Sequence, residues 1–549
     1  MSLPPAPRLT PTTAAALADD LAALPYTTDA VEDLLGPAAV AALDREHAEA
    51  ARHVLATLPR EHPRRALAAL VGAFMLGDPV PAEDLAAALP ALGLDGAVEA
   101  GLVVVEDAGD GADGAPGEGR TVRATCDLSP YETDEPGRMW VASDQTALQR
   151  RGPLPAEHVL GIGRASLTLA GAVQRRAVDT ALDLGTGCGI QTLHLLAHAR
   201  HVTATDLAPR CLEFTRFNLL LNADVLGLDR ERLEERVELL VGDMLEPVAG
   251  RRFDMVVSNP PFVITPRTDP DAPVMVYRDG GREGDRLVAE LVAGLSGVLA
   301  AGGTAQMLAN WEIPAASDDD GAPAWDARPR SWVAEGMQAW FVQRDVQDAA
   351  GYAETWLQDS SLELDPEAYQ RRYAEYLEDF TARGVAGVGF GHVWLRRPAA
   401  DGSQGRAWTV AEELTGPVDD ALGPAWAAAI ARRDRLAAGM GGAASDGDPA
   451  LAVLRGLHLR VAEDVTEERH QRFGAEHPEV ILARQGSGFR RTARLDTATA
   501  GLLAASDGEL TVGQIVGALA ALLELDATAQ TALLVAVREL YEDGFLVEA

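Results

Sequence analysis

The chain has 549 residues, which predicts three to four domains at about 150 residues per domain. It carries 83 acidic residues against 47 basic ones, for a net charge of −36, and it contains no lysine. The absence of lysine excludes a Schiff-base lysine and the phosphate-binding lysine of a Walker motif. The charge argues against a protein that coats duplex nucleic acid, but leaves room for a local basic patch.

The cysteines and the N-terminal sequence indicate in which cellular compartment the protein is expected. Cys126, Cys188 and Cys211 form no C-x-x-C pair, so we expect neither a disulfide framework nor a zinc site. This cysteine usage fits a cytoplasmic protein. The N-terminus lacks a charged region followed by an apolar core, and we therefore expect no signal peptide and no membrane partner.

Residues 1–150 are predicted to form a helical, winged-helix-like domain. Ala- and Leu-rich segments with helical periodicity extend from about residue 11 to residue 102, and a strand-like segment at 101–105 follows. The Gly- and Asp-rich stretch 107–120 is typical of a loop between two strands of a wing. Its acidic residues lack the spacing of a calcium loop, which favours a solvated loop.

Residues 151–397 are predicted to form an α/β domain with a Rossmann-like, doubly wound sheet, because short apolar strands alternate there with helices. Seven strands are expected, at residues 180–184, 201–205, 237–241, 253–258, 304–308, 339–343 and 385–395. Residues 398–449 contain Gly-, Ser- and Asp-rich stretches and are predicted to be a linker. Residues 450–549 are predicted to form a second winged-helix-like domain.

A glycine-rich turn follows the first predicted strand, in the sequence DLGTGCG at 183–189. Its G-x-G-x-G spacing differs from the G-x-G-x-x-G of dinucleotide sites and favours S-adenosylmethionine over NAD. Candidate cofactor contacts in this turn are Asp183, Gly185, Thr186 and Gly187.

Two further strand ends supply candidate cofactor residues. Asp206, followed by Leu207, ends the second predicted strand, where a carboxylate can accept hydrogen bonds from both hydroxyls of a ribose. Gly242, Asp243 and Met244 follow the third strand, where we expect Asp243 near an adenine amino group and Met244 against the ring.

The sequence SNPPF at 258–262 ends the fourth predicted strand. The side-chain oxygen of Asn259 and the carbonyl of Pro260 can accept the two N–H bonds of a planar nitrogen, which makes that poor nucleophile more reactive. Pro260 and Pro261 remove backbone donors, so the loop presents acceptors. Phe262 is expected to stack on the target group. All four residues are candidate catalytic residues.

This loop resembles the N-P-P-[YF] signature of class I S-adenosylmethionine-dependent methyltransferases that act on amino or amide nitrogens. The sequence DGGREG at 279–284 is similar to a segment of release-factor glutamine methyltransferases, and the resemblance covers about residues 155–310. It implies cofactor contacts at Asp183, Gly185, Gly187, Asp206 and Asp243, and target contacts at Asn259, Pro260 and Phe262. Phe262 departs from the tyrosine usual in that family, and N-P-P-F also occurs in ribosomal-RNA base methyltransferases.

Other candidates have both a functional and a structural interpretation. Gly161–Arg164 is a small-residue turn that would line the methionine end of the cofactor pocket or simply begin a helix. His194, His198 and His201 have helical spacing but no carboxylate to complete a ligand set, so we expect no metal. Trp311 and Glu312 would border the active site or pack in the core. The aromatic residues between the last two strands would form core or a lid; they are Tyr352, Trp356, Tyr369, Tyr373, Tyr376 and Phe380. The densest basic stretch of the last domain contains Arg484, Arg490, Arg491 and Arg494.

The sequence therefore predicts an S-adenosylmethionine-dependent N-methyltransferase that acts on a planar amide or exocyclic amino nitrogen. Its partner would be a protein glutamine, as in a translation factor, or a nucleobase of RNA or DNA. The alternative is a degenerate methyltransferase that recruits partners through its flanking domains. The intact Asp206 and Asn259 favour the enzyme.

Overall fold

The computed structural model describes residues 3–106, 120–150, 154–267, 278–315, 324–359, 365–438 and 448–549. The loop predicted at 107–120 lies, apart from Arg120, outside the described residues. None of the helices in the described ranges combines the length and apolar character needed to cross a membrane.

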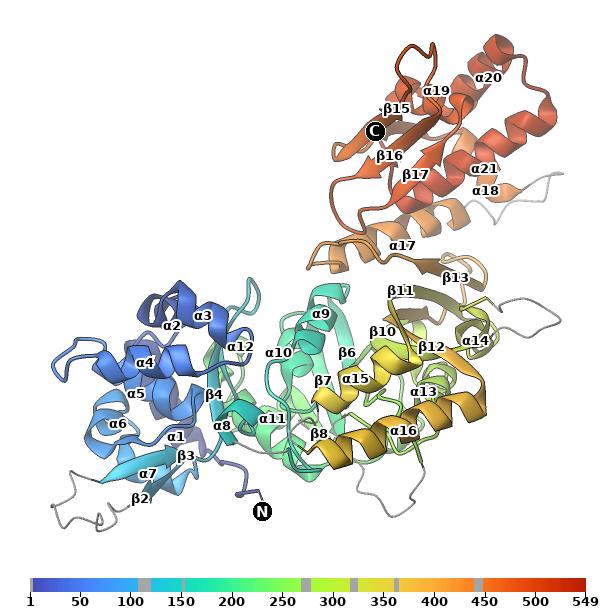
Figure 1. The fold of residues 1–549 in the computed structure, drawn as a ribbon. Helices are drawn as coiled ribbons and strands as arrows, with labels where there is room; N and C mark the ends of the chain where they lie inside the picture. Colours follow the sequence, from blue (N-terminus) through green and yellow to red (C-terminus); the bar gives the residue numbers. More distant parts are fainter. Residues whose placement is uncertain are drawn as a thin grey trace.

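An eight-stranded mixed sheet forms the centre of the molecule, with strand order β13-β11-β12-β10-β9-β6-β7-β8 (Figure 1). Strands β8, β7, β6, β9 and β10 are parallel, and β12 is antiparallel to both β10 and β11. The strands are β6 (Val178–Leu184), β7 (Ala199–Asp206), β8 (Val237–Val241), β9 (Phe253–Ser258), β10 (Leu299–Pro314), β11 (Gln338–Asp348), β12 (Val385–Arg396) and β13 (Trp408–Glu413). All seven predicted strands are confirmed, and the fold is the expected Rossmann-like α/β class.

Both faces of this sheet are covered. Successive side chains of a strand point to opposite faces, and Ala181 and Leu182 of β6 belong to two different hydrophobic clusters. Ala181 shares its cluster with Phe214 of α11, whereas Leu182 shares its cluster with Leu291 of α13. The helices of this part are α9 (Arg164–Ala172), α10 (Ile190–Leu195), α11 (Pro209–Leu221), α12 (Ala223–Leu226), α13 (Arg286–Leu295), α14 (Ala327–Ser331), α15 (Ala349–Asp359) and α16 (Pro366–Arg383). Single 3₁₀ turns occur at η2 (Leu233–Glu235) and η3 (Glu246–Val248).

The prediction that residues 398–449 form a linker is wrong for most of that interval. Strand β13 pairs in parallel with β11, and helix α17 (Gly423–Ala437) packs beside it. Tryptophans hold this addition to the sheet: the ring of Trp408 stacks on that of Trp394, with centroids 5.7 Å apart and planes 6° apart. The Gly- and Ser-containing turn before β13 concealed a short strand whose pairing partner lies about 70 residues earlier in the chain.

The N-terminal part contains a three-stranded sheet, β1-β3-β2, together with several short helices. Helix, strand, two helices and a strand pair follow one another as in a winged helix. Its elements are α1 (Pro11–Ala23), α2 (Thr28–Leu35), α3 (Pro37–Leu43), α4 (Glu49–Thr57), α5 (Arg65–Leu70), η1 (Val71–Met75), β1 (Val80–Pro81), α6 (Ala82–Ala88), α7 (Gly93–Glu99), β2 (Val103–Glu106) and β3 (Thr121–Ala124). A hairpin of β4 (Asp127–Glu132) and β5 (Arg138–Ser143) and the short α8 (Ala147–Arg150) lead to the central sheet.

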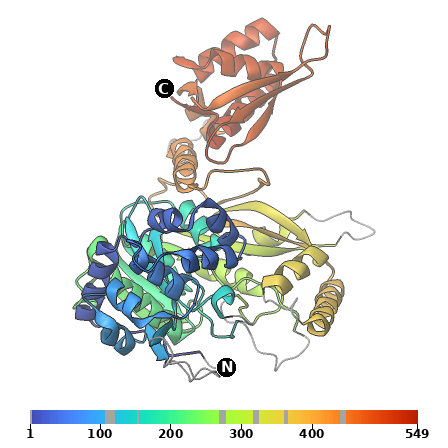
Figure 2. The same cartoon turned by 60° about the vertical axis from the view of Figure 1, so that its left-hand side comes forward.

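The C-terminal part contains two three-stranded sheets, β18-β14-β19 and β15-β16-β17. The first sheet and helices α19 to α21 again have a winged-helix-like arrangement. The elements are α18 (Pro449–Arg455), β14 (His458–Val461), β15 (Val465–His470), β16 (Val480–Gln485), β17 (Thr492–Leu495), α19 (Thr497–Ala505), β18 (Asp507–Thr511), α20 (Val512–Leu523), α21 (Ala527–Asp543) and β19 (Leu546–Glu548). Figures 1 and 2 show this part standing away from the N-terminal helices and reached through α17.

Candidate functional site

The glycine-rich turn between β6 and α10 is formed as predicted. Gly185, Gly187 and Gly189 have positive φ angles of 74°, 58° and 96°, a region that L side chains rarely adopt. Gly185 and Gly187 line a cavity, and a Cβ at either position would meet no other atom closer than 4.0 Å. Side chains there would therefore extend into open space along the turn, where the two glycines leave room for a ligand.

Asp183 supports this turn from beneath. Its carboxylate accepts hydrogen bonds from the hydroxyls of Thr186 (2.6 Å) and Thr192 (2.7 Å), while Oδ1 is buried without a hydrogen-bond partner in the described part of the chain. Burial raises the pKa of Asp183 to about 6. Asp183 is not among the residues that line the cavity, so its predicted direct contact with a cofactor stays a prediction.

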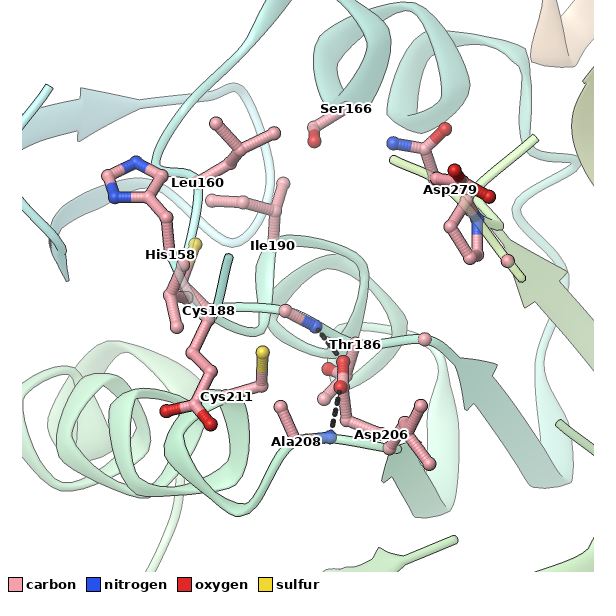
Figure 3. Close-up of a pocket in the computed structure, with 18 of the residues that line it drawn as sticks. His158, Leu160, Ser166, Thr186, Cys188, Ile190, Asp206, Ala208, Cys211 and Asp279 are labelled. Atoms are coloured by element: carbon pink, nitrogen blue, oxygen red, sulfur yellow. Dashed lines mark hydrogen bonds between the residues drawn. The ribbon is translucent and has the colours of Figure 1, made fainter. Parts of the chain in front are cut away.

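Asp206 stands on the cavity wall at the end of β7, with its carboxylate held by main-chain donors. Oδ2 accepts the N–H of Gly187 at 2.9 Å and Oδ1 accepts the N–H of Ala208 at 3.0 Å (Figure 3). The Cys211 thiol and the main chain at Leu207 also approach this carboxylate. Burial raises the pKa of Asp206. A carboxylate fixed in this way on the cavity wall is the kind of acceptor that ribose hydroxyls require.

The cavity itself has a volume of about 390 Å³, within the range of small-molecule sites. It brings together residues that are far apart in the sequence, from β6, β7, β8, β9 and the segment before α9. Its walls include the predicted Gly161, Gly185, Thr186, Gly187, Asp206, Leu207, Asp243, Met244, Asn259 and Pro261. Other lining residues were not foreseen as site residues: Glu157, His158, Val159, Leu160, Ser166, Cys188, Ile190, Gln191, Ala208, Cys211 and Arg282.

Asp243 is paired across the cavity with Arg282, whose Nη2 donates to Oδ2 at 2.9 Å. The other carboxylate oxygen has no hydrogen-bond partner among the described residues and can accept an amino group. Gly242 does not line the cavity. A Cβ at this position would meet Cγ of Pro247 at 2.4 Å, so the close approach of Pro247 requires glycine. The sequence placed Asp243 correctly but did not reveal its partner.

The N-P-P-F loop lies between two cavities. Asn259 and Pro261 line the first, whereas Phe262 lines a second one. The Asn259 carboxamide makes no hydrogen bond with any other described residue, so its oxygen is available as an acceptor. The carbonyl of Pro260 accepts the N–H of Phe262 at 2.8 Å, which leaves one lone pair for a substrate. Pro260 itself is buried and lines neither cavity.

The segment that resembles D-G-G-x-x-G braces this loop. The N–H of Gly280 donates to the carbonyl of Pro261 at 3.0 Å, and Phe262 and Asp279 form an isolated β-bridge. Asp279 is buried, forms an ion pair with Arg267 and accepts the N–H of Gly281 at 2.9 Å. These bonds fix the loop that carries Asn259.

The N-terminal part contributes one wall of the first cavity, which the sequence did not reveal. Asp144, directly after β5, accepts the N–H of Val159 at 3.0 Å and the Nε of Arg210 at 2.9 Å. Gly161 lies so close to β5 that a Cβ would meet the Oγ of Ser143 at 2.5 Å. The hairpin thus positions segment 157–161 against the site.

Three groups of candidates have structural roles. Trp311 is fully buried and donates its Nε1 hydrogen to Gln343 at 2.9 Å, and Glu312 pairs with Arg383. The aromatic cluster between β11 and β12 is core, with Tyr352 and Phe380 fully buried. His194 bonds the Tyr131 hydroxyl at 2.5 Å. No group of three or more potential metal ligands occurs in the described ranges.

The arginine cluster of the C-terminal part is used mainly for internal pairing. Arg491 pairs with Glu412 at 2.7 Å, Arg490 with Asp419 at 2.7 Å and Arg484 with Glu468 at 2.9 Å. Two of these three pairs join the C-terminal part to the segment around β13. The stretch therefore serves as a docking contact rather than an open basic patch.

Two family models match separate parts of the chain. Residues 161–317 match the family described as "Methyltransferase small domain", and residues 23–113 match a family described as a domain of unknown function (DUF7059). The match to the methyltransferase family covers the first cavity from Gly161 to Arg282.

Curated relatives are similar over the same part. A release factor glutamine methyltransferase of Moorella thermoacetica is 38% identical over 133 residues, 23% of this chain and 43% of the relative. A ribosomal protein uL3 glutamine methyltransferase of Bradyrhizobium diazoefficiens is 33% identical over 89 residues, 16% of this chain and 25% of the relative. This chain spans less than half the length of either relative.

Among solved structures, an S-adenosylmethionine-dependent methyltransferase from Thiobacillus denitrificans in complex with S-adenosyl-L-homocysteine is 17% identical. The alignment covers 43% of this chain and 91% of that chain, with a TM-score of 0.23.

Proposed function

We propose that this chain is an S-adenosylmethionine-dependent N-methyltransferase whose target is the side-chain amide of a protein glutamine. The observation that carries the proposal is the placement of Asn259: its unengaged carboxamide lines the cavity that also contains Asp206 and the glycine turn. The relatives named as glutamine methyltransferases support an amide as the target.

The residues around the first cavity fit this cofactor. Gly185 and Gly187 leave room beside the main chain, Asp206 presents its carboxylate to ribose hydroxyls, and Asp243 offers one acceptor for an adenine amino group. When bound, S-adenosylmethionine supplies an electrophilic methyl group on a sulfonium centre. Cys188 does not compete for that methyl group, because burial raises the pKa of its thiol to about 12 and keeps it uncharged.

The chain's own residues would activate and orient the target nitrogen. An amide nitrogen is a weak nucleophile because its lone pair is delocalised. Acceptance of its two N–H bonds by the Asn259 side-chain oxygen and the Pro260 carbonyl returns electron density to nitrogen. Phe262 offers a flat apolar face at the same loop. Orientation of this kind supplies a large part of the rate, with effective molarities of about 10⁵–10⁸ M in favourable cases.

The test of the proposed function is transfer of label from S-adenosylmethionine into an extract of a strain that lacks the protein. We expect label in the protein fraction and N-methylglutamine after digestion. Label in RNA or DNA instead would establish a nucleobase as the target. If calorimetry shows no binding of S-adenosylmethionine at all, the chain is a binding module and not an enzyme.

Asn259→Ala should abolish methyl transfer while leaving the affinity for S-adenosylmethionine nearly unchanged, because Asn259 faces the substrate. Asp206→Ala is the matched control: it should weaken cofactor binding by about 1.5–3 kcal/mol, the scale of a hydrogen bond to a charged group. Calorimetry and single-turnover transfer measure the two effects. Equal loss of binding and transfer in Asn259→Ala would refute its role as a substrate contact.

A further inference from the structure

A second cavity of about 840 Å³ is lined in part by two segments that also line the first. The N-P-P-F loop borders both, with Asn259 on one side and Phe262 on the other. The start of α9 also borders both, since Ser166 lines the first cavity and Thr168 the second. A molecule held in the second cavity therefore lies next to the loop that would receive the target nitrogen.

Arg344 on β11 places a positive charge on the wall of this cavity. The pairing of β11 with β12 shifts register between Gln343 and Asp345, so Arg344 is the extra residue of a β-bulge. Bulges change the direction of a side chain, and Arg344 lines the cavity. Gly391 of β12 pairs with Gln343, next to this bulge. A Cβ at Gly391 would meet the Val342 carbonyl oxygen at 1.9 Å.

The Arg344 guanidinium lacks a counter-charge among the described residues. Its Nη2 donates to the Gly416 carbonyl at 2.7 Å, but Nη1 is buried without a hydrogen-bond partner in that part of the chain, and no described carboxylate forms an ion pair with it. Burial lowers the pKa of Arg344, with no carboxylate opposing that shift. The side chain is half-buried, and its buried Nη1 is the group that an anionic partner would engage.

The cavity is lined by further charged residues, among them Arg164 and Asp420, and no ion pair links either of them to Arg344 in the described part of the chain. His392 lines the same cavity, and burial, with the nearby Arg344 charge, lowers its pKa to about 4, so it is neutral at pH 7. Asp419 is neutralised by Arg490 at 2.7 Å and accepts the N–H of Gly488 at 2.6 Å. Phe262 and Phe390 add apolar wall. The cavity thus suits a partly apolar segment that carries an isolated negative charge.

We propose that the second cavity receives the protein segment that carries the target amide, and that the Arg344 guanidinium pairs with an Asp or Glu side chain of that segment. The proposal rests on the proposed function and deepens it, because it assigns a substrate class to the same site. A protein segment is favoured over RNA by charge: a nucleic acid brings many phosphates, whereas this cavity also contains Asp420 and belongs to a chain of net charge −36.

The test measures peptide binding directly, without methyl transfer. The full chain, saturated with S-adenosylhomocysteine, is titrated with labelled capped heptapeptides that have a central Gln and one Glu at each neighbouring position in turn. Each peptide is paired with one in which that Glu is replaced by Gln. We expect at least one Glu peptide to bind ten-fold or more tightly than its counterpart. Arg344→Gln should abolish the difference, and Arg344→Lys should retain part of it.

Arg371→Gln, an exposed arginine on α16, is the matched control and should leave the difference unchanged. Thermal melting of each variant confirms that it is folded. Equal affinity of all Glu and Gln peptides for the unaltered chain overturns the proposal, as does a difference that survives in a folded Arg344→Gln variant. Tighter binding of a short single-stranded RNA, lost in Arg344→Gln, assigns the cavity to a phosphate instead. Failure of the proposed function is recognised separately, as peptide discrimination without any methyl transfer.

Discussion

The two winged-helix-like parts of this molecule have similar arrangements but join the central sheet in different ways. The N-terminal part shares one continuous hydrophobic cluster with β6, β7 and α11. The C-terminal part has a separate cluster of its own and reaches the sheet through α17 and the loop at 486–491. The first is thus built into the central domain, whereas the second is attached to its edge.

Polar contacts follow the same division. In the N-terminal part, Asn218 and Asn222 of α11 bond the main chain of β5 at Ala142 and Trp140, with distances of 2.7–2.9 Å. In the C-terminal part, Phe489 packs against Trp340 and Trp426, which also contact each other, and the Arg491 guanidinium lies 4.2 Å from the Phe489 ring centroid. The first contact builds a wall of the first cavity, and the second supports the edge of the second cavity through Asp419. The N-terminal part therefore supports the first cavity and the C-terminal part the second, because the two parts attach to the central sheet at different places.

The largest effect should come from Asp144→Ala. This residue is 1% exposed and joins Arg210 to Val159, so its removal leaves a partly buried guanidinium without its counter-charge and a main-chain N–H without its acceptor. Breaking such a pair costs about 3–5 kcal/mol. We expect that loss in the free energy of unfolding, together with weaker binding of S-adenosylmethionine, by denaturation and calorimetry. The exposed Asp134→Ala, in the same hairpin, should change neither; if the two variants behave alike, the hairpin does not hold the cavity wall.

An intermediate effect should appear in acid. Burial lowers the pKa of His158 to about 4 from its ordinary 6.5. Between these two pH values the unfolded chain therefore binds a proton at this histidine that the folded chain does not bind. The stabilisation is present above about pH 6.5 and is lost as pH falls toward 4. His158→Gln should therefore reduce the acid-induced loss of stability by about 2 kcal/mol at pH 4.5.

Comparison of variant with parent isolates this group from Asp127 and Asp183, whose raised pKa values of about 7 and 6 act in the opposite direction. His470→Gln, exposed in the C-terminal part, is the control and should leave the pH profile unchanged. Identical profiles for His158→Gln and the parent, measured by urea unfolding, would count against the buried neutral histidine.

The smallest effect should come from Phe489→Leu, which keeps an apolar side chain but removes the aromatic contacts. We expect a loss of about 1 kcal/mol, confined to attachment of the C-terminal part. Limited proteolysis should become faster between residues 414 and 448, with cofactor affinity unchanged. Phe473→Leu, fully exposed on the β15–β16 turn, should have no effect. Weaker cofactor binding in Phe489→Leu would show that the two parts are coupled more tightly than their separate cores indicate.

Most of the first cavity could be predicted from the sequence because its residues follow strand ends. Parallel strands bring their carboxyl ends to one edge of a sheet, so Gly185, Asp206, Asp243 and Asn259 must gather there once the strand order is right. Of the wall made by residues 157–161, only Gly161 was predicted from the sequence. The rest could not be predicted, because it depends on Asp144 of a hairpin that pairs with the side chains of α11 rather than with another strand.

The sequence by itself determined the Rossmann-like sheet, the glycine turn and the N-P-P-F loop, because strand periodicity, glycine conformation and proline geometry are local properties of the chain. Only the tertiary structure decided that Phe262 faces a different cavity from Asn259, that Arg344 is a bulge residue without a counter-charge, and that β13 extends the sheet. These features depend on contacts between segments distant in sequence, and pairing and burial of that kind leave no local signal. The charge of −36 argues against an extended nucleic-acid partner, and Arg344, which forms no ion pair with a described carboxylate, is where we propose that an acidic side chain of the partner binds.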